Sequence, residues 1–197
     1  MVGKTSVLHR YINRKFIKID VKNRTINTNY IKKKIQLNDK SFLLNIWDTA
    51  GEEKYHAIAP IFYRGADGAV IIFDVTRKET FGKAEKWFKE LNQFCENNPN
   101  IILVGNKIDL PERQITNEES IELASKYKSP FLEVSALNGD NVDSIFNILT
   151  DNIYNKKQKE IEENNRKNIR NIPYKNKLRN ITVSEKDYIK KKKNNCC

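Results

Sequence analysis

The chain has 197 residues, of which 36 are Lys or Arg and 25 are Asp or Glu, so its formal net charge is +11. This length fits one domain of ordinary size with an appendage, and such a domain buries enough surface to fold without disulfides or a structural metal. Only 3 cysteines are present, which excludes a disulfide-built secreted scaffold, and no apolar run is long enough for a membrane span or a signal segment. We therefore expect an intracellular protein.

Apolar runs alternate with amphipathic stretches as far as residue 154. In chain order the pattern predicts a helix over 6–13, strands over 28–37 and 42–47, a strand over 69–74, a helix over 80–96, a strand over 101–105, a helix over 118–127, a strand over 131–134 and a helix over 142–154. Asn38-Asp39 is expected to turn the first two strands into a hairpin, and Asn117 to cap a helix. Cys95 falls on a buried helical stripe, where we expect it to serve packing.

The later strands are short runs rich in Ile and Val, as is typical of strands buried on both faces of a parallel sheet. A hairpin followed by alternating strands and helices predicts an α/β fold with a doubly wound, mostly parallel sheet and helices on both faces. Residues 155–197 are rich in Asn, Lys and Glu without a sustained apolar period, and we expect a flexible tail.

The positive charge lies mostly at the end of the chain. Residues 1–150 hold 22 basic and 19 acidic side chains, whereas residues 151–197 hold 14 and 6. A near-neutral body with a basic tail predicts that the tail meets an anionic surface, either a membrane or a nucleic acid. The tail lacks arginine clusters and interleaved aromatic residues, which favours the membrane.

Two motifs are suited to binding phosphate and a metal. Gly3-Lys4-Thr5 stands at a helix start, where the lysine can neutralise phosphate oxygens and the threonine can ligate Mg²⁺. Asp48-Thr49-Ala50-Gly51 follows the strand over 42–47, where an acid can hold a metal through water and a glycine lets a backbone N–H approach a terminal phosphate. Alone, each motif also fits an ordinary helix start or a strand-end turn.

A third motif, Asn106-Lys107-Ile108-Asp109, follows the strand over 101–105. The Asp109 carboxylate can accept hydrogen bonds from the N1–H and N2–H₂ edge of guanine, a pair of donors that adenine lacks. Ser135-Ala136, after the strand over 131–134, offers backbone N–H groups to guanine O6. Ligands of an open α/β sheet bind at the carboxyl ends of its strands, so the conjunction predicts a GTP site and argues against an ATPase.

Over residues 3–154 the chain resembles the Rab branch of the Ras superfamily of small GTPases. The motifs above carry the resemblance together with Ile46–Gly51 and Phe62–Ala66, and residues 55–60 are similar to the early-endocytic Rabs. The resemblance implies a P-loop small GTPase fold and a GTP/GDP switch in vesicle trafficking that hydrolyses GTP slowly without help. It further implies the cytoplasmic face of intracellular membranes, early endosomal ones in particular, with a cytosolic pool.

The resemblance also implies the residues of each site. The residues implied to contact GTP are Gly3, Lys4, Thr5, Ser6, Phe16, Thr25, Gly51, Asn106, Lys107, Asp109, Ser135 and Ala136. The implied catalytic residues are Lys4, Gly51 and Glu52. The implied Mg²⁺ ligands are Thr5, Thr25 and, through water, Asp48. The implied effector-binding aromatic residues are Tyr30, Trp47 and Phe62.

Three departures from the Rab pattern change these expectations. The first strand and the first glycine of the P-loop are absent, so we expect that Met1 is not the natural start; if it is, tight GTP binding is not expected. Glu52 stands where Rabs usually carry the glutamine that orients water, which predicts altered intrinsic hydrolysis and a poor response to activators. Leu137 stands where the family has lysine, which predicts a somewhat lower guanine affinity.

Residues 155–197 are thus expected to be a basic tail that anchors a GTP-binding domain over residues 1–154. Lys190–Lys193 precede Cys196 and Cys197, which the resemblance marks for geranylgeranylation, and two lipid chains with a basic patch give stable attachment. Implied partners of this monomer are escort and GDP-dissociation-inhibitor type proteins, exchange and activating factors, and effectors, but no nucleic acid. The alternative is a nucleotide-deficient or non-hydrolysing adaptor, and the absent strand and Glu52 favour this alternative.

Overall fold

The computed structural model describes residues 1–19, 25, 28–49, 63–96 and 98–170. Its elements in chain order are α1 (Lys4–Asn13), β1 (Asn29–Leu37), β2 (Lys40–Asp48), β3 (Gly68–Asp74), α3 (Lys78–Phe94), β4 (Asn100–Asn106), α4 (Asn117–Lys126), β5 (Phe131–Val134) and α5 (Val142–Arg170). The chain divides into two compact units, Met1–Tyr154 and Asn155–Cys197, and all strands belong to the first.

The predicted hairpin is confirmed. β1 and β2 pair antiparallel, with Asn29 opposite Asp48 and Leu37 opposite Lys40. Asn38 and Asp39 form the turn with φ angles of 49° and 59°, the left-handed conformation that a type I′ hairpin turn requires at both residues and that Asn and Asp tolerate. The hairpin therefore presents alternate residues to the core and to solvent.

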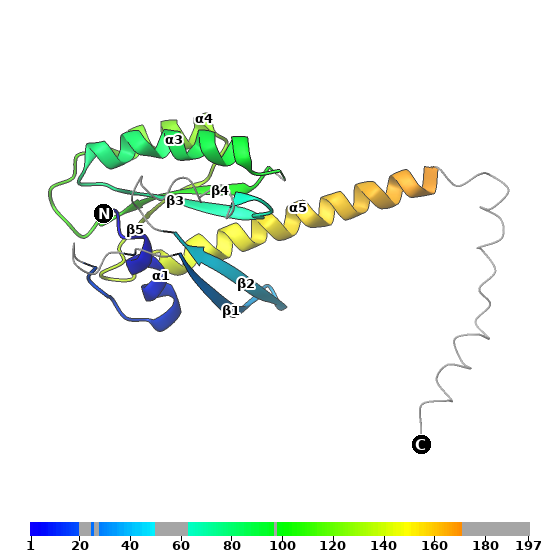
Figure 1. The fold of residues 1–197 in the computed structure, drawn as a ribbon, viewed down its shortest axis with the longest axis horizontal. Helices are drawn as coiled ribbons and strands as arrows, with labels where there is room; N and C mark the ends of the chain where they lie inside the picture. The colour runs from blue at the N-terminus through cyan, green and yellow to red at the C-terminus, as the bar shows by residue number, and fades with distance from the viewer. Residues whose placement is uncertain (20–24, 26–27, 50–62, 97, 171–197) are drawn as a thin grey trace, which may run out of the picture. The chain divides into compact units, whose positions relative to one another are not determined.

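β3, β4 and β5 form a parallel sheet in that order, which confirms the predicted α/β class. Helices α3 and α4 cover one face of this sheet, and α1 and the first turns of α5 cover the other (Figure 1). The core on the α3 side contains Ile71, Phe73, Val75, Ala84, Phe88, Leu91, Cys95, Leu103, Ile115 and Ala124. The core on the α1 side contains Val7, Leu8, Tyr11, Ile102, Val104, Val134, Ala136, Val142, Ile145 and Phe146. Both sheet faces are buried, which explains the unbroken Ile and Val runs.

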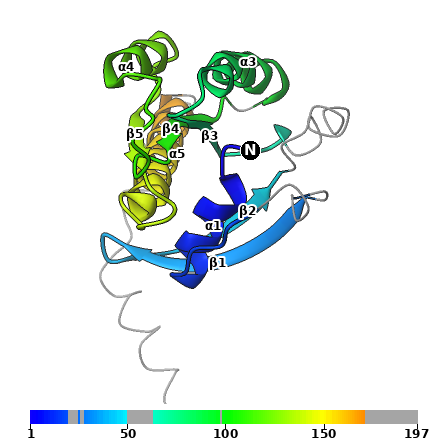
Figure 2. The ribbon, with the colours of Figure 1, turned by 90° about the vertical axis from the view of Figure 1, so that its left-hand side faces the viewer.

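The hairpin and the parallel sheet are separate sheets in the part of the chain that the structure describes. Helix α1 lies between them (Figure 2), and Val7, Leu8 and Tyr11 belong to a core that also includes residues of both sheets. In the family pattern the first strand of the fold lies in the sheet beside the strands over 42–47 and 69–74, which it joins into one sheet. None of the described residues occupies that position.

Helices α1, α3 and α4 begin one or two residues before the predicted starts at 6, 80 and 118, and α3 and α4 end one or two residues before the predicted ends at 96 and 127. Thr116, not Asn117, caps α4: its Oγ1 accepts the Glu119 N–H at 3.1 Å, and the Glu119 carboxylate accepts the Thr116 N–H at 2.8 Å. This reciprocal capping box satisfies two backbone donors, which moves the helix start by one residue. Cys95 ends α3, is buried as predicted, and donates its S–H to the Tyr63 carbonyl at 3.1 Å.

Helix α5 continues to Arg170, so the prediction that the chain is flexible from residue 155 is wrong as far as that residue. The extension consists mostly of Lys, Glu, Gln, Asn and Arg, and over residues 155–166 its side chains are mostly exposed. Its stability therefore derives from helix propensity and pairs such as Glu162–Arg166 at 4.0 Å, not from an apolar face that a periodicity search detects. Among the described residues, no helix is long and apolar enough to cross a membrane.

Candidate functional site

The predicted motifs meet at one edge of the parallel sheet, where the strands end and α1 begins. Gly3 is the N-cap of α1 with φ of 92°. A Cβ atom at Gly3 would lie 2.6 Å from Nδ2 of Asn106, the last residue of β4. The close approach of α1 to the end of β4 therefore requires glycine, both for the backbone conformation and for space.

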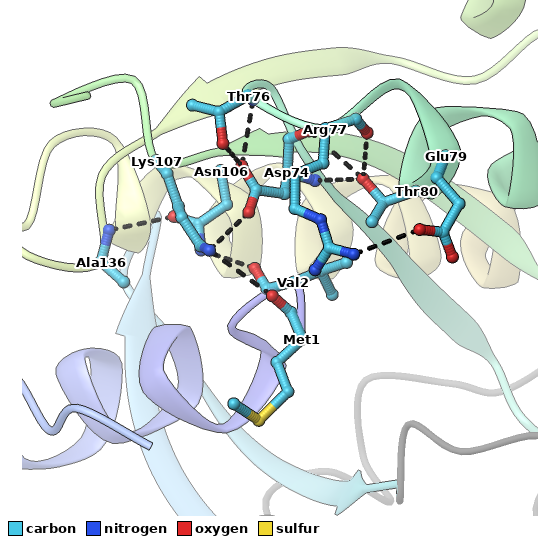
Figure 3. Close-up of polar contacts among 10 residues, drawn as sticks. All are labelled: Met1, Val2, Asp74, Thr76, Arg77, Glu79, Thr80, Asn106, Lys107 and Ala136. Atoms are coloured by element: carbon cyan, nitrogen blue, oxygen red, sulfur yellow. Dashed lines mark hydrogen bonds and ion pairs between the residues drawn. The ribbon is translucent and has the colours of Figure 1, made fainter. Parts of the chain in front are cut away.

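Asn106 connects two of the motifs through its side chain, which is 1% exposed. Its Nδ2 donates to the carbonyl of Val2 at 3.0 Å, and its Oδ1 accepts the N–H of Ala136 at 3.1 Å (Figure 3). A buried amide is stable when both of its ends are hydrogen-bonded, as here. One side chain thus ties the Gly3-Lys4-Thr5 segment to the Ser135-Ala136 loop.

The loops after β4 and β5 are also joined through Asp109. Ser135 Oγ donates to Asp109 Oδ1 at 2.5 Å and accepts the N–H of Asn138 at 3.0 Å, which orients the carboxylate. The backbone N–H of Ser135 donates to the Asp140 carbonyl at 3.2 Å. The backbone N–H of Ala136 donates to the Asn106 side chain. The two backbone N–H groups expected to face guanine O6 therefore both have protein acceptors in this structure.

Three oxygen atoms from separate segments lie together beside Lys4. Thr5 Oγ1 is 2.7 Å from Thr25 Oγ1 and donates to Asp48 Oδ2 at 2.8 Å. Two hydroxyls and a carboxylate are the kind of ligand that Mg²⁺ prefers, so these residues fit the predicted ion. In the described ranges no group of three His, Cys, Asp or Glu side chains offers another metal site.

Burial sets the charge balance of this cluster. Asp48, at the end of β2, is 5% exposed, and burial raises its pKa, although the Thr5 hydrogen bond and the Lys4 charge act in the opposite direction. Burial likewise lowers the pKa of Lys4, which the charge of Asp48 partly offsets. Each group is thus stabilised in its charged form by the other, and a further cation near Asp48 would add to that stabilisation.

The remaining predicted residues divide into those in the described part of the chain and those outside it. Tyr30 and Trp47 face each other across the hairpin with ring centroids 4.6 Å apart, and they are 44% and 49% exposed. Ser6 is buried in the first turn of α1, and Phe16, after α1, is 38% exposed. The predicted residues that lie outside the described part of the chain are Gly51, Glu52, Phe62, Cys196 and Cys197.

Arg10, to which no sequence pattern points, supports the loop in which Leu137 stands where the family has lysine. Arg10 Nε donates to the Ala136 carbonyl at 2.8 Å, and its Nη2 contacts the Leu137 carbonyl. The Leu137 side chain itself is 47% exposed. The Arg10 side chain therefore holds this loop through the backbone carbonyls of the loop. No sequence pattern around Arg10 indicates partners so distant in the sequence.

Replacing Arg10 by Met is expected to lower the free energy of unfolding by ~1–3 kcal/mol, because the carbonyls of Ala136, Leu137 and Arg14 lose a charged donor. Urea denaturation measures this change. The control is Arg14→Met, which removes an ion pair with Asp143 whose side chains are 66% and 48% exposed. Such an exposed pair contributes at most about 1 kcal/mol, so equal losses in the two variants would contradict the role assigned to Arg10.

Loops that converge at the carboxyl ends of the strands form the place where α/β proteins of this class bind their ligands. The Ras family model matches residues 1–155. Ras-related protein RABA4b of Arabidopsis thaliana is 41% identical over 155 residues, which cover 78% of this chain and 68% of the relative. Ras-related protein SEC4 of Candida albicans is 39% identical over 204 residues, covering 100% and 89%. Ras-related protein Rab-11A of Dictyostelium discoideum is 39% identical over 151 residues, covering 76% and 70%.

The chain therefore belongs to the Ras family and is a small GTPase of the Rab type. It binds and hydrolyses GTP and acts as a GTP/GDP switch in vesicle trafficking. Membership in this family entails association with membranes, regulators and effectors. The family assignment thus favours the hydrolysing switch over the non-hydrolysing adaptor.

Proposed function

We propose that residues 1–154 form the nucleotide-binding domain of this switch, with GTP or GDP lying along the sheet edge described above. The observation that carries the proposal is the Asn106 side chain, which joins the phosphate half of the site to the base half. The residues proposed for the phosphate half are Gly3, Lys4, Thr5, Ser6, Thr25 and Gly51. The residues proposed for the base half are Phe16, Asn106, Lys107, Asp109, Ser135 and Ala136.

Mg²⁺ would be held by the hydroxyls of Thr5 and Thr25 and, through water, by Asp48. When bound, the ion supplies positive charge that neutralises phosphate oxygens. Lys4 adds a buried ammonium group near Asp48, and burial strengthens its attraction for a phosphate anion. Asp48 balances the charge of Lys4 and accepts the Thr5 hydroxyl, which keeps that hydroxyl in position.

Binding of fluorescent GDP and ADP to the full chain tests this proposal. We expect GDP to bind at least ~100-fold more tightly, because adenine presents no pair of donors to Asp109. Chelation of Mg²⁺ with EDTA is expected to accelerate GDP release, and re-addition of Mg²⁺ to restore slow release. Equal affinities for GDP and ADP, or release that does not respond to EDTA, would contradict the site.

Glu52 is proposed as the residue that orients the attacking water, on sequence grounds because it lies outside the described residues. A carboxylate a few ångströms from the triphosphate adds a repulsion of up to ~4 kcal/mol at an effective dielectric constant near 20. We expect Glu52→Gln to raise the single-turnover hydrolysis rate and the response to an activating factor. Glu53→Gln is the control, and identical rates for the wild type and Glu52→Gln would refute this role.

The tail is proposed to anchor the switch to early endosomal membranes, with geranylgeranyl groups on Cys196 and Cys197 and with Lys190–Lys193 at the anionic lipid surface. Escort and GDP-dissociation-inhibitor type proteins, exchange factors and activating factors would act on it, and effectors would bind at Tyr30, Trp47 and Phe62. Intact-mass measurement of the native protein, together with fractionation of its source cells, tests the lipid groups and the compartment.

A further inference from the structure

A carboxylate that the site assignments leave unused is buried at the end of β3. Asp74 has a relative exposure of 0%. Its Oδ1 accepts the N–H and O–H of Thr76 at 3.0 and 2.7 Å, and its Oδ2 contacts the ammonium of Lys107 (Figure 3). Burial opposes ionisation, but the contacts from Lys107 and Thr76 outweigh it and hold the pKa of Asp74 below its usual range. Asp74 is therefore an anion at neutral pH.

Lys107 extends from this anion toward the start of α1. Its backbone has a φ of 73°, and its side chain is 33% exposed. Its Nζ also lies 3.5 Å from the carbonyl oxygen of Met1, in the segment that leads into Gly3 (Figure 3). A lysine side chain rotates about four bonds, so it occupies one position only when a partner fixes its ammonium group.

Asp74 is itself rigidly held. Its backbone N–H donates to Thr80 Oγ1 at 3.0 Å, and this hydroxyl donates to the Arg77 carbonyl at 2.8 Å. The next residue, Val75, donates its N–H to the carbonyl of Asn106 at 3.0 Å, which extends the pairing of β3 with β4. The carboxylate thus offers Lys107 a fixed point of attachment.

A purely structural role does not account for the charge of Asp74. Both donors of Thr76 bind the same oxygen, Oδ1, and an asparagine at this position could accept them equally well. The second oxygen contacts the Lys107 ammonium, and the negative charge of Asp74 also acts on the N-terminal ammonium of Met1. Because a buried carboxylate is costly when it has no cationic partner, Lys107 explains why an acid stands here.

We propose that Asp74 is a positioning residue for guanine-nucleotide binding and that it acts through Lys107. The ion pair holds the Lys107 ammonium beside the Met1 carbonyl, so that the lysine is already in place between the phosphate and base halves when nucleotide arrives. Preorganisation of this kind raises affinity because less side-chain freedom is lost on binding. The inference rests on the proposed nucleotide contact of Lys107.

A double-mutant cycle on the full chain tests the proposal, with the dissociation rate of fluorescent GDP as the readout. Asp74→Asn is expected to accelerate dissociation by about 10- to 100-fold, and Lys107→Met by at least as much. The double variant is expected to release GDP no faster than Lys107→Met, because Asp74 acts only through the lysine. Glu85→Gln, which breaks the 2.8 Å ion pair of α3 with Lys126 on α4, is the matched control and should leave the rate unchanged.

Urea denaturation of each variant accompanies the kinetics. Additive effects of Asp74→Asn and Lys107→Met, or a dissociation rate of Asp74→Asn within about two-fold of the wild type, would overturn the proposal. If Asp74→Asn fails to fold, the cycle is run with Thr76→Val, which removes one hydrogen bond to the carboxylate, and additivity again overturns it. A wild-type chain that does not bind GDP would instead refute the proposed function, and this inference with it.

Discussion

Replacement of Asp109 by Asn is expected to turn the guanine site into one that prefers xanthine. A carboxylate accepts hydrogen bonds from both the N1–H and the N2–H₂ of guanine, whereas an amide offers one acceptor and one donor. The amide NH₂ then opposes the guanine amino group but matches the carbonyl that xanthine carries at the same place. In the variant the hydrogen bond from the guanine amino group is lost, and the bond from N1–H loses its charged acceptor. Hydrogen bonds to a charged partner contribute ~1.5–3 kcal/mol each, so the affinity for GDP should fall by ~10²–10⁴-fold.

Competition between GDP and xanthosine diphosphate for the Asp109→Asn variant measures this change. The fold should persist, because an amide oxygen can still accept the Ser135 hydroxyl that now binds Asp109 at 2.5 Å. Asp140→Asn is the control: its carbonyl still accepts the Ser135 N–H, and its carboxylate contacts only Asn138 Nδ2, at 3.3 Å, among the described hydrogen bonds. An Asp109→Asn variant that still prefers GDP would show that the base lies elsewhere.

Replacement of Gly3 by Ala is expected to lower the free energy of unfolding by ~3–4 kcal/mol. An L-residue at φ of 92° is strained by about 1–2 kcal/mol. The added Cβ would also lie 2.6 Å from Nδ2 of Asn106, so the amide must move away from Val2 and Ala136. Each of those hydrogen bonds contributes about 1 kcal/mol.

Gly82→Ala is the matched control for this substitution. Gly82 lies inside α3, and a Cβ atom there would meet nothing within 4 Å. Alanine in a helix interior is more stable than glycine by ~0.5–1 kcal/mol, so this variant should gain stability. Urea denaturation of both variants measures the contrast, and a Gly3→Ala variant as stable as the wild type would contradict the close packing at this edge.

The strands and the hairpin could be predicted from the sequence because their burial imposes a pattern. The runs at 69–74, 101–105 and 131–134 are buried on both faces, and the structure places their ends within one residue of the prediction. The N-cap of α4 could not be predicted to the residue, because Thr116 and Asn117 are both residues that cap helices well. Only the reciprocal hydrogen bonds with Glu119 select Thr116. The extension of α5 has no apolar period at all, so a periodicity search ends at residue 154.

The site could be predicted in part for the same physical reason. Motifs at strand ends are brought to one edge by the topology, and Thr5 lies within hydrogen-bond distance of both Thr25 and Asp48. The role of Arg10 in the loop at Ala136 and Leu137 could not be predicted, because these partners follow it by more than a hundred residues and bind through backbone atoms. Asp74 ends a predicted strand, and only its burial beside Lys107 distinguishes it from a surface acid.

The Asn106 bridge has a consequence for the way nucleotide leaves. Because this amide binds Val2 on one side and Ala136 on the other, neither segment can shift far without breaking a buried hydrogen bond. A movement that breaks the contacts to the phosphates therefore also weakens the contacts to the base. A nucleotide that has lost its contacts at one end is then bound more weakly at the other end. Nucleotide release should accordingly occur in one cooperative step, which an exchange factor can start by displacing either the segment at Val2 or the loop at Ala136.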